Sequence, residues 1–163
     1  MKKRILTIVF TLFAITACTP EKPIPFDPSI RTLQESGYTL SAMNVPDMLC
    51  LQGGLYEETN LVFMHLYCAI EDEIDMITIA FNASDSQGGI ERMIEVLEFI
   101  GFPHTQVLPK FLSQNEADIF EGVQVNQIFG RWKIYASTEK SGTDRYMIVA
   151  FHSQNFSEEV EEH

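Results

Sequence analysis

The feature that most constrains the fold is an alternating apolar pattern in LVFMHLYCAI, residues 61–70. Alternation with a period of two is typical of a strand that lays one face on a core. The apolar residues occupy the even positions: Val62, Met64, Leu66, Cys68 and Ile70. A charged turn at 71–75 follows, and the alternation resumes in MITIAFN at 76–82. The core side of this second segment is also apolar: Ile77, Ile79 and Phe81. The two segments predict a β-hairpin.

A helix is predicted over residues 84–101. Its apolar residues recur at helical spacing, with charged residues on the opposite face: Ile90, Met93, Ile94, Leu97 and Ile100. Asp85 or Ser86 provides an N-cap. Gly101 follows the last periodic residue, and Pro103 prevents easy continuation.

A second hairpin is predicted near the end of the chain. RWKIYAS at 131–137 and RYMIVAFH at 145–152 are both prone to form strands, and the polar segment TEKSGTD at 138–144 separates them as a turn. One face of the first strand is apolar: Trp132, Ile134 and Ala136.

Shorter elements complete the pattern. Residues 29–36 predict a short helix that ends at Gly37, and residues 38–44 alternate as a strand would. The segment SQNE at 113–116 fits a capping box, which predicts a helix that starts there and ends near Gly122.

Together these elements predict one α+β domain, with a mostly antiparallel sheet of two hairpins flanking a central helix. A small curled sheet approaching a half-barrel is the alternative. The chain has 163 residues, of which 45% are hydrophobic and 11% aromatic, and this is enough for one sizeable core.

The N-terminus carries a different pattern. Lys2, Lys3 and Arg4 precede an apolar stretch at 5–17. This stretch is shorter than the roughly 20 residues that a membrane-spanning helix needs, and the combination is typical of a secretory signal peptide. The residues ITAC at 15–18 then resemble the lipobox of the bacterial lipoproteins: an aliphatic residue, two small residues and a cysteine.

This resemblance covers residues 1–20 only. It implies cleavage before Cys18 and attachment of acyl chains such as palmitate to its sulfur and its new amino group. Because Thr19 stands where an aspartate commonly favours inner-membrane retention, it implies the periplasmic face of the outer membrane, with the inner membrane as the alternative. An ordinary signal peptide with a chance cysteine, or an uncleaved anchor, is the other interpretation.

Four segments are expected from these patterns. Residues 1–17 are a signal peptide, and residues 18–29 are an extended tether, because TPEKPIPFDPS contains four prolines. Residues 30–152 form the single periplasmic domain, and residues 153–163 form an acidic tail.

The charge excludes one class of function. Removal of residues 1–17, which carry three cations and no acid, takes the formal net charge from −12 to −15. A nucleic-acid-binding protein needs basic patches to neutralise phosphates, so that class is excluded. The acidic first half is either a solvated surface or a docking face for a cationic partner. The candidate partner-binding residues lie in the acidic turn and the last hairpin: Glu71, Asp72, Glu73, Asp75, Arg131, Lys133 and Tyr135.

Two cysteines remain besides Cys18. In an oxidising periplasm Cys50 and Cys68 predict a disulfide, which would stabilise the fold by roughly 3 kcal/mol in the chain-entropy model. Two buried free thiols are the alternative.

The chain carries no recognised catalytic pattern. It has no nucleophile elbow, zinc-protease motif, phosphate loop or dinucleotide fingerprint, and its four histidines lack ligand spacing. We therefore predict no catalytic residue, no metal and no cofactor, and a protein that is not an enzyme.

These patterns favour a lipid-anchored binding or accessory protein of an envelope complex, such as a pilus, secretion or sensor assembly. Its expected partners are the membrane, through Cys18, and a protein, for which the acidic charge suggests a cationic surface. An acidic inhibitor or immunity protein that neutralises a periplasmic enzyme is the alternative. A small-ligand carrier and a hydrolase rank below both.

Overall fold

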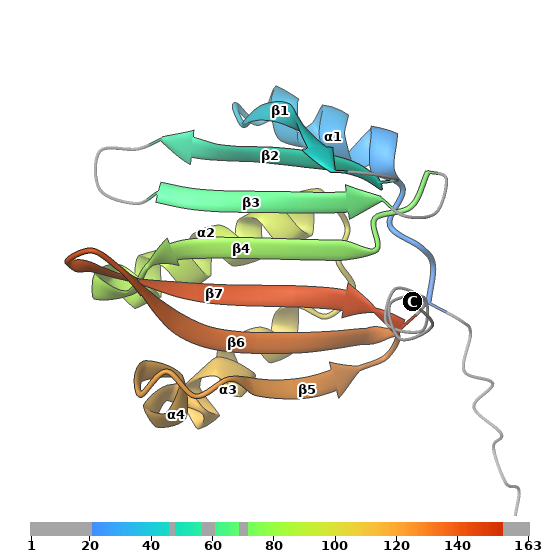
Figure 1. Ribbon diagram of the computed structural model, residues 1–163. Coiled ribbons are helices and arrows are strands. Elements are labelled where there is room, and N and C mark those ends of the chain that lie inside the picture. Colours follow the sequence, from blue (N-terminus) through green and yellow to red (C-terminus); the bar gives the residue numbers. More distant parts are fainter. Residues whose placement is uncertain (1–20, 46–47, 57–60, 69–71, 155–163) are drawn as a thin grey trace, which may run out of the picture.

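A single antiparallel sheet of seven strands forms the body of the protein (Figure 1). The computed structural model describes residues 21–45, 48–56, 61–68 and 72–154, and for residues 43–65 and 67–68 it describes the backbone alone where it describes them at all. The strand order is β1-β2-β3-β4-β7-β6-β5, so β1 and β5 are the edges and the sheet does not close.

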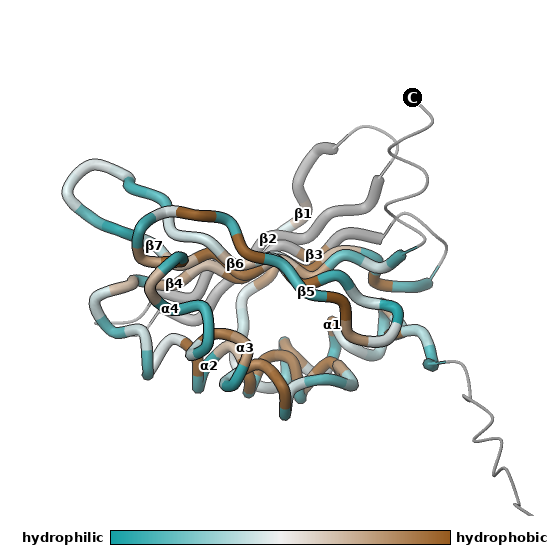
Figure 2. The backbone as a smooth tube through the Cα atoms, turned by 90° about the horizontal axis from the view of Figure 1, so that it is seen from below, coloured by the Kyte–Doolittle hydropathy of each residue, from teal (hydrophilic) through white to brown (hydrophobic). Residues whose placement is uncertain are grey.

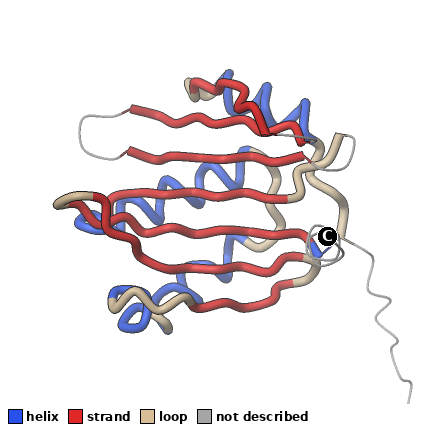
Figure 3. Tube along the Cα trace, viewed as in Figure 1, coloured by secondary structure: helices blue, strands red, loops and turns tan. Residues whose placement is uncertain are grey.

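The elements follow one another in this order: α1 (Phe26–Glu35), β1 (Thr39–Val45), β2 (Met48–Tyr56), β3 (Leu61–Cys68), β4 (Met76–Asn82), η1 (Ala83–Asp85), α2 (Ser86–Phe99), η2 (Thr105–Val107), α3 (Leu108–Gln114), α4 (Glu116–Phe120), β5 (Val125–Phe129), β6 (Trp132–Ser141) and β7 (Asp144–Ser153). Figure 3 distinguishes the helices from the strands along this path.

The helices cover one face of the sheet (Figure 2). Helix α2 packs against β3 and β4, α4 packs against β6, and α1 packs against β1 and α2. Burying the apolar stripe of each helix against the apolar side of the sheet is what holds the two layers together. The result is one helical layer on one sheet.

The core lies between these layers. Strand pairing places Ile134, Phe151, Ile77 and Leu66 in one row across four strands. All four side chains are fully buried. The long-range pairing of β4 with β7 therefore joins the two halves of the chain in the middle of the core.

The α+β fold with a mostly antiparallel sheet is confirmed. Both predicted hairpins are present, as β3–β4 and β6–β7. The predicted inward residues of β4 and β6 are buried to 1% exposure or less: Ile77, Ile79, Phe81, Trp132, Ile134 and Ala136. Of the even positions predicted inward on β3, Leu66 is fully buried, and the others lie outside the described side chains.

Two strands were missing from the prediction. β2 contains Gly53 and Gly54, which weaken the strand pattern of this segment. β5 is a five-residue edge strand whose central residues are exposed, so it shows little apolar alternation. The polar turn predicted at 138–144 is also too long. β6 and β7 continue through most of it and leave Gly142 at the turn, with a φ of 65°.

The capping box predicted at 113–116 is wrong. Ser113 lies in the last turn of α3, where its hydroxyl donates to the Lys110 carbonyl, and α3 begins five residues earlier with Pro109 in its first turn. The predicted end near Gly122 is right, because Gly122 follows α4 with a φ of 85°.

The predicted boundary of the tether also differs from the structure. α1 begins at Phe26, three residues before the expected start, and both Ile24 and Phe26 are buried. The prolines suggested an extended linker, but their apolar neighbours belong to the core. At the other end, Ser153 belongs to β7 rather than to the acidic tail, whose residues 155–163 lie outside the described part.

Candidate functional site

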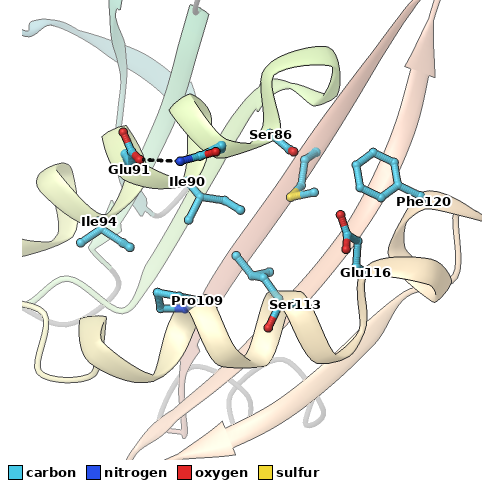
Figure 4. A pocket seen from close by; sticks show the side chains of 11 residues that line it. Ser86, Ile90, Glu91, Ile94, Pro109, Ser113, Glu116 and Phe120 are labelled. Carbon is cyan, nitrogen blue, oxygen red and sulfur yellow. Dashed lines mark hydrogen bonds between the residues drawn. The ribbon is translucent and has the colours of Figure 1, made fainter.

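An apolar groove runs between α2 and the α3–α4 segment (Figure 4). Its volume is about 500 Å³, within the range of sites that accept a small ligand or a few side chains of a partner. Met147 of β7 and Leu112 of α3 form a buried floor. The half-buried walls are Ile90, Ile94 and Phe120.

The start of α2 positions one wall. The Asn82 side chain accepts a hydrogen bond from the Ser84 amide at 2.9 Å, and the Asp85 carboxylate caps α2 by accepting from the Gly88 amide at 3.1 Å. Gly89 lets the helix approach the Phe81 ring so closely that an added Cβ would overlap it. These contacts fix the first turn of α2 on β4, and Ile90 of the groove wall follows Gly89 directly.

The β6–β7 hairpin positions the other wall. Thr138 donates its hydroxyl to the Ile119 carbonyl at 2.7 Å, and the Arg145 guanidinium donates to the Phe120 carbonyl at 2.7 Å. Both bonds satisfy carbonyls at the C-terminal end of α4, where a cation is also favourable. Phe120 is thereby held at the end of the groove.

The charged groups that line the groove are both acidic. Glu91 lies on α2 and Glu116 lies on α4, and both side chains are exposed at the rim. Gln87 donates to Glu91 at 3.2 Å. An apolar floor with carboxylates at its rim suits an apolar group that carries positive charge beside it.

The acidic turn does not form one continuous surface. Glu71 lies outside the described residues, and Asp72 is exposed. Glu73 instead pairs with Arg131 within the molecule. Asp75 is fully buried and accepts a hydrogen bond from the Ser153 hydroxyl at 3.1 Å.

The candidate residues of the last hairpin do not form one surface either. Lys133 and Tyr135 lie on the sheet face opposite the helices, where the Lys133 ammonium is 5.0 Å from the Tyr135 ring centroid. His152 joins them with its ring 4.9 Å from that of Tyr135. Burial, and then the nearby charge of Lys133, lower the pKa of His152 below 6.5. Arg131 precedes β6 and belongs to the Glu73 contact instead.

The predicted lipidation and disulfide fall on residues whose side chains are outside the description. Cys18 precedes the described residues. Cys50 and Cys68 lie on neighbouring strands, where the backbone register pairs Cys50 with Tyr67 and Cys68 with Leu49. Both modifications stay predictions.

The sequence did not identify the groove as a site. Ile90 and Ile94 were predicted as part of the apolar stripe of α2, and they do lie on that side, yet both remain partly exposed. The stripe alone did not indicate this exposure, because the same spacing is typical of a face that is wholly buried. Nothing in the sequence pointed to the groove residues of α3 and α4, because one helix from 113 to near Gly122 was predicted where the structure has two.

The described residues hold no group of three or more His, Cys, Asp or Glu side chains arranged to bind a metal. In the same part of the chain, no helix is both long and apolar enough to span a membrane.

The fold and the groove define an α+β protein with one open antiparallel sheet and a groove in its helical layer. Comparison with known proteins adds no family to this description: no protein-family model, no curated protein and no solved structure matches the chain.

Proposed function

We propose that the protein is a lipid-anchored binding protein of the bacterial envelope, and that it holds an apolar, positively charged segment of a partner protein in the α2–α3 groove. The observation that carries the binding role is the pairing of an apolar floor with an acidic rim. The lipobox-like residues that end at Cys18 support the anchor. Membership of a pilus, secretion or sensor assembly is the setting that suits such a protein.

The charge of the chain supports a cationic partner. The form that begins at Cys18 has a formal charge of −15, which would steer a basic protein toward it and repel an acidic one. The same property fits an inhibitor that neutralises a basic periplasmic enzyme. Capture of one secreted enzyme rather than a component of an envelope complex would favour the inhibitor.

The test is affinity isolation of the full-length protein from its native envelope after mild crosslinking, with mass spectrometry of what is captured. Glu91→Lys with Glu116→Lys reverses both charges of the groove rim. Glu35→Lys with Glu139→Lys is the matched control, because it makes the same change in net charge at exposed residues that do not line the groove.

We expect the rim variant to lose at least tenfold of the captured partner, since a tenfold loss needs about 1.4 kcal/mol and placing like charges together at an interface costs several kcal/mol. The control should retain most of it. Equal loss in both variants would assign binding to overall charge, and no loss in either would remove the groove from the proposal.

The anchor has a test of its own. Cys18→Ala should release the protein from membranes or block its processing. Unchanged processing and unchanged membrane association would refute lipidation at this residue.

A further inference from the structure

The first described residues are fastened to one end of the sheet. One carboxylate oxygen of Glu21 accepts a hydrogen bond from the Arg131 amide at 3.1 Å, and the other contacts Nε2 of His104. The His104 ring is itself placed between the rings of Phe102 and Phe129. The groups that bind Glu21 are therefore held in place by the rest of the fold.

The residues after Glu21 continue this attachment. The Ile24 carbonyl accepts from the Ile74 amide at 2.9 Å, and the Phe26 amide donates to the Asp72 carbonyl at 2.7 Å. The side chain of Ile24 is only 2% exposed. Residues 21–26 thus form a docked strap, joined to the domain by backbone bonds, by burial and by the Glu21 carboxylate.

The strap shortens the free chain between the domain and the predicted lipid. An extended tether over residues 18–29 would reach about 40 Å, whereas the three residues from Cys18 to Glu21 reach about 10 Å. A lipid on Cys18 would therefore hold this end of the sheet close to the headgroups.

A shallow depression lies beside the strap. Lys22, Pro23, Gly101 and Pro103 lie together around this depression, and Glu98 is the acid that lines it. Acids also lie against the strap, because the Phe26 amide binds the Asp72 carbonyl and Pro25 bridges to Glu73, which pairs with Arg131. The short free chain, and not charge attraction, therefore holds this end near the headgroups.

The groove lies toward the opposite end of the strands. β4 begins at Met76, beside His152 near the strap, and ends at Asn82, beside Tyr146. Ser86 and Met147 line the groove near that second end. Figure 1 shows the strap and the start of α2 at opposite ends of β4.

We infer that the strap orients the domain on the membrane: the strap end faces the lipid headgroups, and the end of the groove near Ser86 lies away from them. This inference rests on the proposed lipid anchor at Cys18. The strap would then act as a spacer of fixed length that presents the groove to a partner.

The test uses the full-length protein in its native envelope with a photoreactive benzoylphenylalanine at one of two positions. Pro103 lies beside the strap, and Thr143 lies in the exposed β6–β7 turn at the far end. After irradiation, we expect at least five times more lipid adducts at 103 than at 143. Equal adduct yields at the two positions would overturn the inference.

Removal of the Glu21 carboxylate should weaken this bias. Glu21→Ala should reduce the ratio between the two positions at least threefold, whereas Glu35→Ala, which removes an exposed acid from α1, should leave it unchanged. An unchanged ratio in Glu21→Ala would overturn the role of the Glu21 carboxylate in this orientation. Thermal unfolding of both variants checks that the domain stays folded.

Acylation of Cys18 is measured separately in the same samples. The mass of the N-terminal peptide reports whether Cys18 carries acyl chains. An unmodified Cys18 would overturn the anchor and with it the orientation, whereas acylated protein with equal adducts at both positions overturns the orientation alone.

Discussion

The guanidinium nitrogen Nη2 of Arg131 lies 3.5 Å from the carboxylate oxygen Oε2 of Glu73. This pair joins the acidic turn after β3 to the start of β6, two segments that the sequence suggested as separate surfaces for partners. Part of the charge expected to recruit another molecule is therefore used within this one.

We expect the Glu73–Arg131 pair to contribute modestly to stability. The two side chains are 29% and 19% exposed, and pairs of this kind couple by about 0.5 kcal/mol. A double-mutant cycle with Glu73→Gln and Arg131→Gln, followed by urea unfolding, measures the coupling. The coupling free energy should be smaller in about 1 M salt, where charges are strongly screened. A coupling that is absent at low salt, or that does not change with salt, would contradict an ion pair between these two side chains.

Gly89→Ala should destabilise the fold by about 2–3 kcal/mol, because the new Cβ would overlap the buried Phe81 ring between α2 and β4. Gly142→Ala is the control. Nothing lies within 4 Å of its added Cβ, so its cost of about 1 kcal/mol comes from the positive φ alone. Urea unfolding compares the two.

A second substitution separates crowding from other effects at Gly89. Phe81→Leu removes most of the ring, so the double variant should be less destabilised than the sum of the two single variants. Strict additivity would mean that the ring and the glycine do not meet.

The contribution of His152 to stability should fall as the pH is lowered through 6.5. The pKa of His152 lies below 6.5 in the folded state, mainly because of burial and then because of Lys133. The unfolded state therefore binds more protons in this range, and protonation favours unfolding. His152→Gln should flatten the change in unfolding free energy between pH 7 and pH 5.5. A slope equal to that of the wild type would assign the dependence to other groups.

The thiols of Cys50 and Cys68 should resist alkylation in the unfolded, unreduced protein and react after reduction, as the predicted disulfide requires. Directly opposite residues are the close neighbours across an antiparallel pair. In the described register Cys50 and Cys68 are offset by one residue. A bridge would thus imply a local shift of β2 against β3, and two freely labelled thiols would end the disulfide prediction.

The fold was predictable where periodicity and caps agree. β4 and α2 combine regular apolar spacing with strong end signals, such as the Asp85 cap, and both appear close to their expected bounds. β2 and β5 were not predictable in the same way, because glycine pairs and short edge strands owe their conformation to the neighbours they pair with.

The candidate site was less predictable than the fold. The groove needs α2, α3 and β7 together, and the floor residue Met147 lies more than 30 residues from Leu112 in the sequence. The strap escaped prediction for a related reason. The Glu21 carboxylate meets an amide at Arg131, 110 residues away, and no local pattern marks such a contact.

The central position of the β4–β7 pairing has a consequence for how the chain folds. β1 to β4 can pair in sequence as they are synthesised, but the outer side of β4 stays unpaired until Asp144–Ser153 is made. Pairing between such distant segments is slow, and an open apolar strand edge invites pairing with other chains. A chain that stops before Asp144 would therefore expose the middle of its sheet rather than its margin, and would be the form most prone to aggregate.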